Sequence, residues 1–203
     1  MKKLNSPVAL RAEKGLGLPV GTVFRRQDVA DKLPAVDRVL SQALKAGTVR
    51  KARQGLYYVP KQTPFGEAPP SQERLVGKFL EDQHFLLFNP SCYNALGLGT
   101  TQLYNTTVVY NHKRHGKFTL AGFNFDFRDK PRFPSAKQVT KEYLLVDLLN
   151  NLDELAEDPA EVMERVQRKL ASFDQQRLEK SLKKYGSAKT RRYMAQLETD
   201  SHA

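Results

Sequence analysis

Residues 34–60, PAVDRVLSQALKAGTVRKARQGLYYVP, decide the fold of the N-terminal part of this chain. Apolar residues recur there at spacings of three and four, which predicts a helix with one apolar face. These residues are Val36, Val39, Leu40, Ala43 and Leu44. Gly47 follows the last apolar turn, where a left-handed C-cap falls. Residues 48–50 and 56–59 are then predicted strands, joined by a turn at 52–55.

The predicted hairpin is basic at its tip, where Arg50, Lys51 and Arg53 lie close together in sequence. In a helix-turn-helix protein the second helix enters the major groove, and neighbouring segments contact the phosphates. A helix that leads directly into a basic hairpin suits that arrangement.

Length and composition indicate a globular chain. The 203 residues are enough for one large or two small domains, and the 40% hydrophobic share supports a core. No apolar run approaches the roughly 20 residues of a membrane span, so we expect no membrane association. The lysines of MKKLNSPVAL precede no long apolar region, so we expect no signal peptide. Cys92 is the single cysteine, which excludes an internal disulfide and favours a cytoplasmic location.

The positive charge is concentrated at the N-terminus. The formal net charge is +11, and residues 1–62 carry 13 Lys and Arg against four Asp and Glu. Residues 63–134 carry eight against six, and residues 135–203 carry 12 against 12. This asymmetry favours a polyanionic partner for the N-terminal part, although a merely soluble basic surface is the alternative.

The order of elements before the hairpin fits one architecture. A Ser-Pro pair begins a predicted helix at residues 6–14, and a short apolar strand follows at 22–24. A second helix is predicted at 26–33, before the helix that Pro34 begins. Helix, strand, helix, helix and hairpin is the order of a winged helix-turn-helix, which we predict for residues 1–62.

The rest of the chain is predicted to be a separate domain. Prolines and a glycine mark residues 63–72 as a linker. Strands are predicted at residues 85–88, 102–110, 118–120 and 123–127. A helix that Ser71 could cap is predicted at 72–83, and a short helix is predicted from Asn89 to Gly97 or Gly99. Four further helices are predicted: one from Tyr143, one that Asp158-Pro159 begins, one that ends at Gly186, and one at 187–197. The predicted fold class is therefore α+β: a winged helix-turn-helix, then a mixed α+β domain at 73–203 with a small antiparallel sheet and a helical C-terminal end.

The sequence resembles a known family at specific residues. GTVFRRQDVAD (21–31) and AVDRVLSQALKAGTVRKARQGLYYVPK (35–61) contain the patterns G-x-x-F, V-x-R-x-L and R-x-G-x-Y-Y-x-P. Over roughly residues 18–61 they look like the N-terminal domain of the AbiEi-like antitoxins of type IV toxin–antitoxin systems, and of winged-helix regulators of the DUF6088 type. NPSCYNALGL, VVYNHKRHGK and YLLVDLLNNL resemble the second domain of that family more loosely.

This resemblance implies a function in phage defence. Such antitoxins repress their own promoter through the winged helix, which binds double-stranded DNA that we expect to carry inverted repeats. The second domain counters a nucleotidyltransferase-like toxin, and no stable complex with that toxin is expected.

The third helix supplies the predicted base contacts. Its polar face carries Arg38 and Gln42, one turn apart, which match guanine and adenine edges. Ser41 and Lys45 suit phosphate or sugar contacts, and Asp37 could accept from cytosine or orient Arg38. An ordinary solvated face is the alternative.

The hairpin and the second helix supply the predicted backbone contacts. Arg50, Lys51, Arg53 and Gln54 form the predicted wing, where positive charge displaces counterions from DNA. Gly55 is expected to provide the positive φ of the turn. Arg25 and Arg26 open a helix that normally crosses the phosphate backbone, and a structural role for these two charges is the alternative.

Two further basic clusters carry weaker signals. NHKRHGK at 111–117 is predicted to be a turn with solvated charges, and contact with nucleic acid or a partner is the alternative. A metal site is not expected, because His112 and His115 lack enough converging partners. The basic residues of 177–192 could form a second nucleic-acid surface, a face for an acidic protein, or a solvated helix end.

No enzyme signature occurs in the chain. A P-loop, G-x-S-x-G, H-E-x-x-H and a dinucleotide glycine pattern are all missing, so we predict no catalytic residue, metal or cofactor. A DNA-binding transcriptional regulator is the preferred interpretation. The alternatives are a nuclease that uses Asp126 and Asp129, and a winged-helix protein-interaction module.

Overall fold

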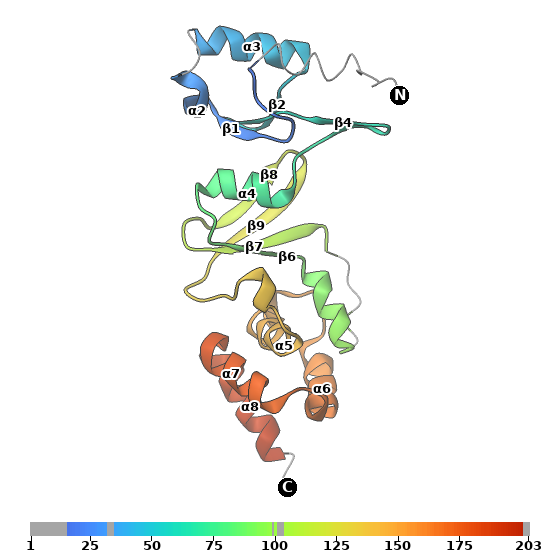
Figure 1. Cartoon of the computed structure of the whole chain (residues 1–203). Helices are drawn as coiled ribbons and strands as arrows, with labels where there is room; N and C mark the ends of the chain where they lie inside the picture. Colours follow the sequence, from blue (N-terminus) through green and yellow to red (C-terminus); the bar gives the residue numbers. More distant parts are fainter. Residues whose placement is uncertain (1–15, 32–34, 99, 101–103, 201–203) are drawn as a thin grey trace, which may run out of the picture. The chain divides into compact units, whose positions relative to one another are not determined.

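The computed structural model describes residues 16–31, 35–98, 100 and 104–200, and it confirms the α+β class (Figure 1). The helix predicted at 6–14 lies outside these residues. The chain begins with β1 (Val23–Arg25), α2 (Arg26–Ala30), α3 (Val36–Ala46), β2 (Arg50–Arg53), β3 (Leu56–Tyr58), β4 (Lys61–Thr63), β5 (Gly66–Ala68) and α4 (Gln72–Leu80). The central elements are β6 (Leu86–Phe88), the 3-10 helix η1 (Pro90–Leu96), β7 (Thr106–Asn111), β8 (Gly116–Leu120) and β9 (Phe123–Asp129). The chain continues with η2 (Ala136–Gln138), α5 (Lys141–Asn150), η3 (Leu152–Glu154), α6 (Pro159–Lys169), η4 (Leu170–Ser172), α7 (Gln175–Tyr185) and α8 (Ala188–Asp200).

The chain forms two compact units. The first contains the described residues up to His84 together with Gly116–Phe125, and the second contains Phe85–His115 and Asp126 onward. This division differs from the predicted boundary at 62–73. Helix α4 belongs to the first unit, where Arg25 Nη2 donates to the Phe79 carbonyl over 3.0 Å.

A three-stranded antiparallel sheet of order β1-β3-β2 organises the beginning of the first unit. Tyr58 lies opposite Val23 on one side and Arg50 on the other. The expected strand pair is thus present, but β2 continues to Arg53 and the turn is only Gln54–Gly55. Gly55 has φ +75°, which confirms its predicted role.

Helix α3 packs on this sheet through its apolar face. Phe24, Val29, Val36, Leu40, Ala43, Val49 and Val59 form one buried cluster. The helix ends at Gly47 (φ +73°), whose N–H bonds to the carbonyls of Ala43 and Leu44 as the predicted C-cap. Burial of each large aliphatic side chain stabilises the fold by about 1.5–3 kcal/mol. The helix face that the sequence predicts to be apolar is therefore the face that packs on the sheet.

The segment predicted as a linker instead contains a hairpin. Strands β4 and β5 pair antiparallel, with Gln62 opposite Glu67. Thr63 closes the turn, because its hydroxyl donates to the Gly66 carbonyl over 2.7 Å. Prolines and glycine therefore mark a tight turn here, as they also do in linkers. Helix α4 then starts at the predicted cap, where Ser71 Oγ accepts from Arg74 N.

Strands β6, β7, β9 and β8 form a four-stranded sheet in that order. In the second unit β6 pairs antiparallel with β7, and Leu87 lies opposite Val109. Val108, Val109 and Tyr110 are all buried, so both faces of β7 are covered.

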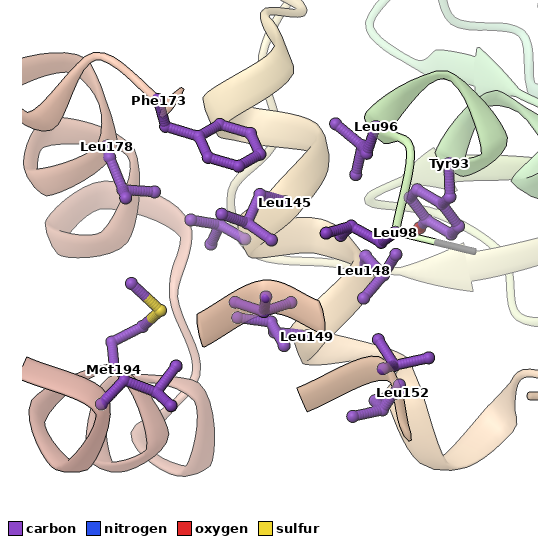
Figure 2. Close-up of a cluster of buried hydrophobic side chains, with 14 residues drawn as sticks. Tyr93, Leu96, Leu98, Leu145, Leu148, Leu149, Leu152, Phe173, Leu178 and Met194 are labelled. Carbon is purple, nitrogen blue, oxygen red and sulfur yellow. The ribbon is translucent and has the colours of Figure 1, made fainter. Parts of the chain in front are cut away.

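The helices of the second unit enclose its main core. Figure 2 shows Leu145, Leu148 and Leu149 of α5 beside Phe173, Leu178 and Met194 from the C-terminal segments. Four helices occur close to where they were predicted, and α6 begins with Pro159 after the capping Asp158.

One carboxylate is buried within this apolar surround. Asp147 of α5 is 2% exposed and accepts hydrogen bonds from the hydroxyls of Tyr93 (2.6 Å) and Tyr110 (3.0 Å). Tyr143 Oη (3.4 Å) and Lys130 Nζ (3.2 Å) complete its surroundings. A buried charge is costly unless it is paired and hydrogen-bonded, and this hub of five residues meets both conditions.

The hub predicts alkaline unfolding. Burial raises the pKa of Tyr93, Tyr110 and Tyr143 above the ordinary value of 10, so above pH 10 the unfolded chain releases protons that the folded chain keeps. Stability therefore falls as pH rises, by up to about 1.4 kcal/mol per pH unit for each tyrosine. Burial lowers the pKa of Lys130, which has the opposite effect, but only up to the ordinary value of 10.5.

Tyrosinate absorbance between pH 9 and 12 measures the ionisation of the tyrosines, and urea unfolding over the same range measures the free energy of unfolding. We expect three of the eight tyrosines to ionise only with unfolding. Ionisation of all eight near pH 10 in a chain with unchanged circular dichroism would contradict the hub.

Candidate nucleic-acid interface

One face of α3 is polar, exposed and without partners. Arg38, Ser41, Gln42 and Lys45 follow one another at helical spacing, opposite the buried Val36, Leu40 and Ala43. Within the described residues, none of the four side chains makes a hydrogen bond or ion pair. The structure therefore brings Arg38 and Gln42, the predicted base-contacting residues, together with Ser41 and Lys45, the predicted phosphate or sugar contacts, on one open surface.

Asp37 is engaged elsewhere than predicted. Its carboxylate accepts from Arg26 Nε (2.6 Å) and Nη2 (2.7 Å), so it does not orient Arg38. The bidentate pair joins the first residue of α2 to the first turn of α3. The hydrogen bonds to Arg26 lower the pKa of Asp37, so the pair stays ionised at neutral pH. Arg26 thus joins α2 to α3 through this ion pair.

Arg25 also has structural contacts. Its Nη2 donates to the Phe79 carbonyl, and its Nε lies 3.2 Å from Glu81 Oε1. Lys78 lies on α4, as Phe79 does, and its Nζ donates to Asp28 Oδ1 of α2 over 2.8 Å. These contacts connect β1 and α2 with α4, which explains the position of α4 in the first unit.

Arg53 does not extend freely from a hairpin tip. Its guanidinium carbon lies 4.5 Å from the ring centroid of Phe118 and 5.6 Å from that of Phe79. The two rings are themselves 5.2 Å apart. In the same region Ala121 N donates to the Ala52 carbonyl over 3.0 Å. Arg53 is therefore part of a cation–π cluster, although its side chain is still exposed.

The remaining residues of the predicted wing also have side-chain partners. Arg50 makes a bidentate pair with Glu67 of β5, at 2.7 and 3.0 Å. Lys51 Nζ donates to Gln54 Oε1 over 2.6 Å, and both side chains remain exposed. Of the cations in the predicted wing, Lys51 alone neither pairs with a carboxylate nor lies against aromatic rings, because Arg50 pairs with Glu67 and Arg53 lies on Phe79 and Phe118.

The second unit brings several charged residues into one cavity of about 360 Å³. Asp126 and Asp129 both line it, together with His115, Arg128, Lys130, Asn151 and Glu154. Asp126 Oδ2 accepts from Arg128 Nε over 2.8 Å, and Arg128 Nη1 lies 2.7 Å from Glu154. In the part of the chain that the structure describes, no three His, Cys, Asp or Glu side chains converge as metal ligands.

The other basic clusters are surface segments. His112 stacks on Phe133, with ring centroids 4.9 Å apart, and Asn111 Oδ1 accepts from Lys113 N. On α7 and α8 the exposed cations are Arg177, Lys180, Lys183, Lys184, Lys189, Arg191 and Arg192. Lys189 pairs with Asp153, and a nucleic-acid role for the others stays a prediction.

Sequence reasoning missed the partners that fix the basic residues. Glu67, Phe79 and Phe118 lie 17 to 65 positions from the arginines they contact, and no local pattern connects such pairs. Asp147 had a visible signal, since it is a lone charge within the apolar run YLLVDLLNNL.

Comparisons with protein-family models, curated proteins and solved structures found no match. No helix among the described residues is long and apolar enough to cross a membrane.

The aromatic cluster predicts that Arg53 contributes to stability. Arg53→Ala should lower the free energy of unfolding by about 1–2 kcal/mol, because each exposed cation–π contact contributes about 0.5–1 kcal/mol. Lys51→Ala on the same strand is the matched control and should change stability by less than about 0.5 kcal/mol. Urea unfolding measures both variants, and equal stabilities would argue against the cluster.

Proposed function

We propose that β1, α2, α3, β2 and β3 form a winged helix-turn-helix that binds double-stranded DNA, and that this chain is a cytoplasmic transcriptional regulator without enzymatic activity. The observation that carries the proposal is the open polar face of α3. Its four side chains have no partner among the described residues, whereas most neighbouring arginines do.

The chemistry of that face suits the major groove. Arg38 can donate two hydrogen bonds to guanine O6 and N7, and Gln42 can pair with adenine N6 and N7. Ser41 lies three positions after Arg38, Lys45 lies three positions after Gln42, and both suit phosphate oxygens. Arg26 and Asp37 would keep α2 and α3 in a fixed relation while α3 contacts the bases.

The charge of the first unit supports the same partner. Its sequence, residues 1–84 and 116–125, holds 16 Lys and Arg against eight Asp and Glu. Such an excess attracts a polyanion and makes binding salt-dependent. The wing would add Lys51 and Gln54 to the phosphate contacts, and Arg25 and Arg53 would serve the protein's own structure.

The resemblance of residues 18–61 to AbiEi-like antitoxins gives the proposal its biological setting. The regulator would repress its own operon and counter a nucleotidyltransferase-like toxin through its second unit, without a stable complex. The observation that supports this part is the sequence resemblance alone.

The DNA-binding face predicts two distinguishable losses of affinity for the DNA upstream of the chain's own gene. Arg38→Ala should cost about 1–3 kcal/mol and relax base preference at one position. Lys45→Ala should weaken binding to all sequences similarly and reduce the salt slope by about 1. Fluorescence anisotropy over a salt series measures both.

Arg168→Ala is the matched control, because this exposed arginine of α6 lies in the second unit. It should bind DNA like the unchanged chain. If Arg38→Ala also binds unchanged, α3 is not the reading helix.

The antitoxin setting predicts rescue in cells. Co-expression with a nucleotidyltransferase-like toxin encoded beside this gene should restore growth, and a chain with Arg38→Ala should still restore it, because neutralisation belongs to the second unit. Colony counts with the toxin under separate control measure this. Continued growth arrest with the unchanged chain would remove the antitoxin reading and leave the regulator reading intact.

A further inference from the structure

Phe65 is an aromatic side chain that the fold leaves entirely in solvent. It lies at the tip of the β4–β5 hairpin with a relative exposure of 101%. Among the described residues the other exposed large hydrophobic side chain is Val20, at 49%. Full burial of a Phe would stabilise a protein by about 1.5–3 kcal/mol, and this hairpin forgoes that gain.

The backbone of the tip is closed by hydrogen bonds. Thr63 Oγ1 accepts from Phe65 N over 3.3 Å and donates to the Gly66 carbonyl over 2.7 Å. Pro64 fixes one φ angle of the turn, and Gly66 adopts φ +109°, which favours glycine. The closed turn holds Phe65 outward from its own hairpin.

The hairpin is anchored to the proposed wing. Glu67 of β5 makes the bidentate pair with Arg50 of β2, which is an edge strand of the three-stranded sheet. Figure 1 shows β4 and its hairpin projecting beyond that sheet. Lys61 adds an exposed cation to the hairpin itself, without a side-chain partner among the described residues.

These surroundings suit DNA better than a protein surface. Stable protein interfaces bury about 800 Å² per partner around an apolar centre, and one isolated aromatic among charges provides no such centre. Single apolar wedges beside basic residues are a recurrent device of minor-groove binding, where they enter a base step and bend the duplex.

We propose that the β4–β5 hairpin is a second DNA-contacting arm whose Phe65 inserts into the minor groove and unstacks a base step. The proposal rests on the DNA binding by α3 proposed above. Phe65 would recognise the shape and stacking of the duplex, whereas the polar side chains of α3 would recognise base edges.

The test compares Phe65→Ala, Phe65→Leu and Val20→Ala on duplexes from upstream of the chain's own gene. Fluorescence anisotropy gives affinity, end-to-end energy transfer gives bending, and 2-aminopurine placed at successive steps reports unstacking. The unchanged chain should bend the duplex and raise the fluorescence of 2-aminopurine at one base step.

Phe65→Ala should bind about tenfold more weakly, reduce the bend and abolish the brightening. Phe65→Leu should keep most of the affinity and most of the bend, since leucine can also enter a base step. Val20→Ala should behave like the unchanged chain. Unchanged circular dichroism and urea unfolding are expected for all three variants, because neither side chain is buried.

Two results would overturn the arm, and they are distinguishable. If the unchanged chain binds DNA and Phe65→Ala binds and bends it equally, the arm is wrong and the regulator proposal stands; a protein partner for Phe65 would give this result. If the unchanged chain binds no duplex, both proposals fail.

Discussion

The contact of Arg53 with the rings of Phe79 and Phe118 joins three segments of the first unit that are far apart in sequence. It connects β2 with α4 and with β8, and the hydrogen bond from Ala121 to Ala52 reinforces the same junction. Because β2 is also an edge strand of the sheet on which α3 packs, this junction connects that sheet with α4 and β8. Tertiary contacts thus determine which cations remain available for a partner.

This selection changes how the charge of the N-terminal part is understood. Composition counts every arginine equally, yet Arg25, Arg26 and Arg50 each face a carboxylate and Arg53 lies on aromatic rings. On α3, Arg38, Ser41, Gln42 and Lys45 keep exposed side chains without a partner among the described residues, and the geometry of one helix places them together. A small open set favours recognition of particular positions over a general attraction to phosphate.

Local sequence patterns predicted most helices and strands, but they did not predict which side chains contact one another across the fold. Helix α3 and its Gly47 cap, the Ser71 cap of α4 and the Asp158-Pro159 start of α6 follow from short-range rules and are present as predicted. The β4–β5 hairpin was missed because Pro and Gly occur in linkers and in tight turns alike. The role of Asp147 depends on tyrosines 37 and 54 positions away, which no window of sequence brings together.

The pair between Glu67 and Arg50 has a further consequence for any anionic partner. A carboxylate that bonds to two donors of a guanidinium makes the same two-point contact as a phosphate group, so Glu67 occupies the donors of Arg50 that an anionic partner would use. A phosphate that takes its place meets a guanidinium whose rotamer is already fixed, and it frees a negative charge on the hairpin. Binding of an anion to Arg50 would then release Glu67, and with it the ion pair that connects β2 with the β4–β5 hairpin.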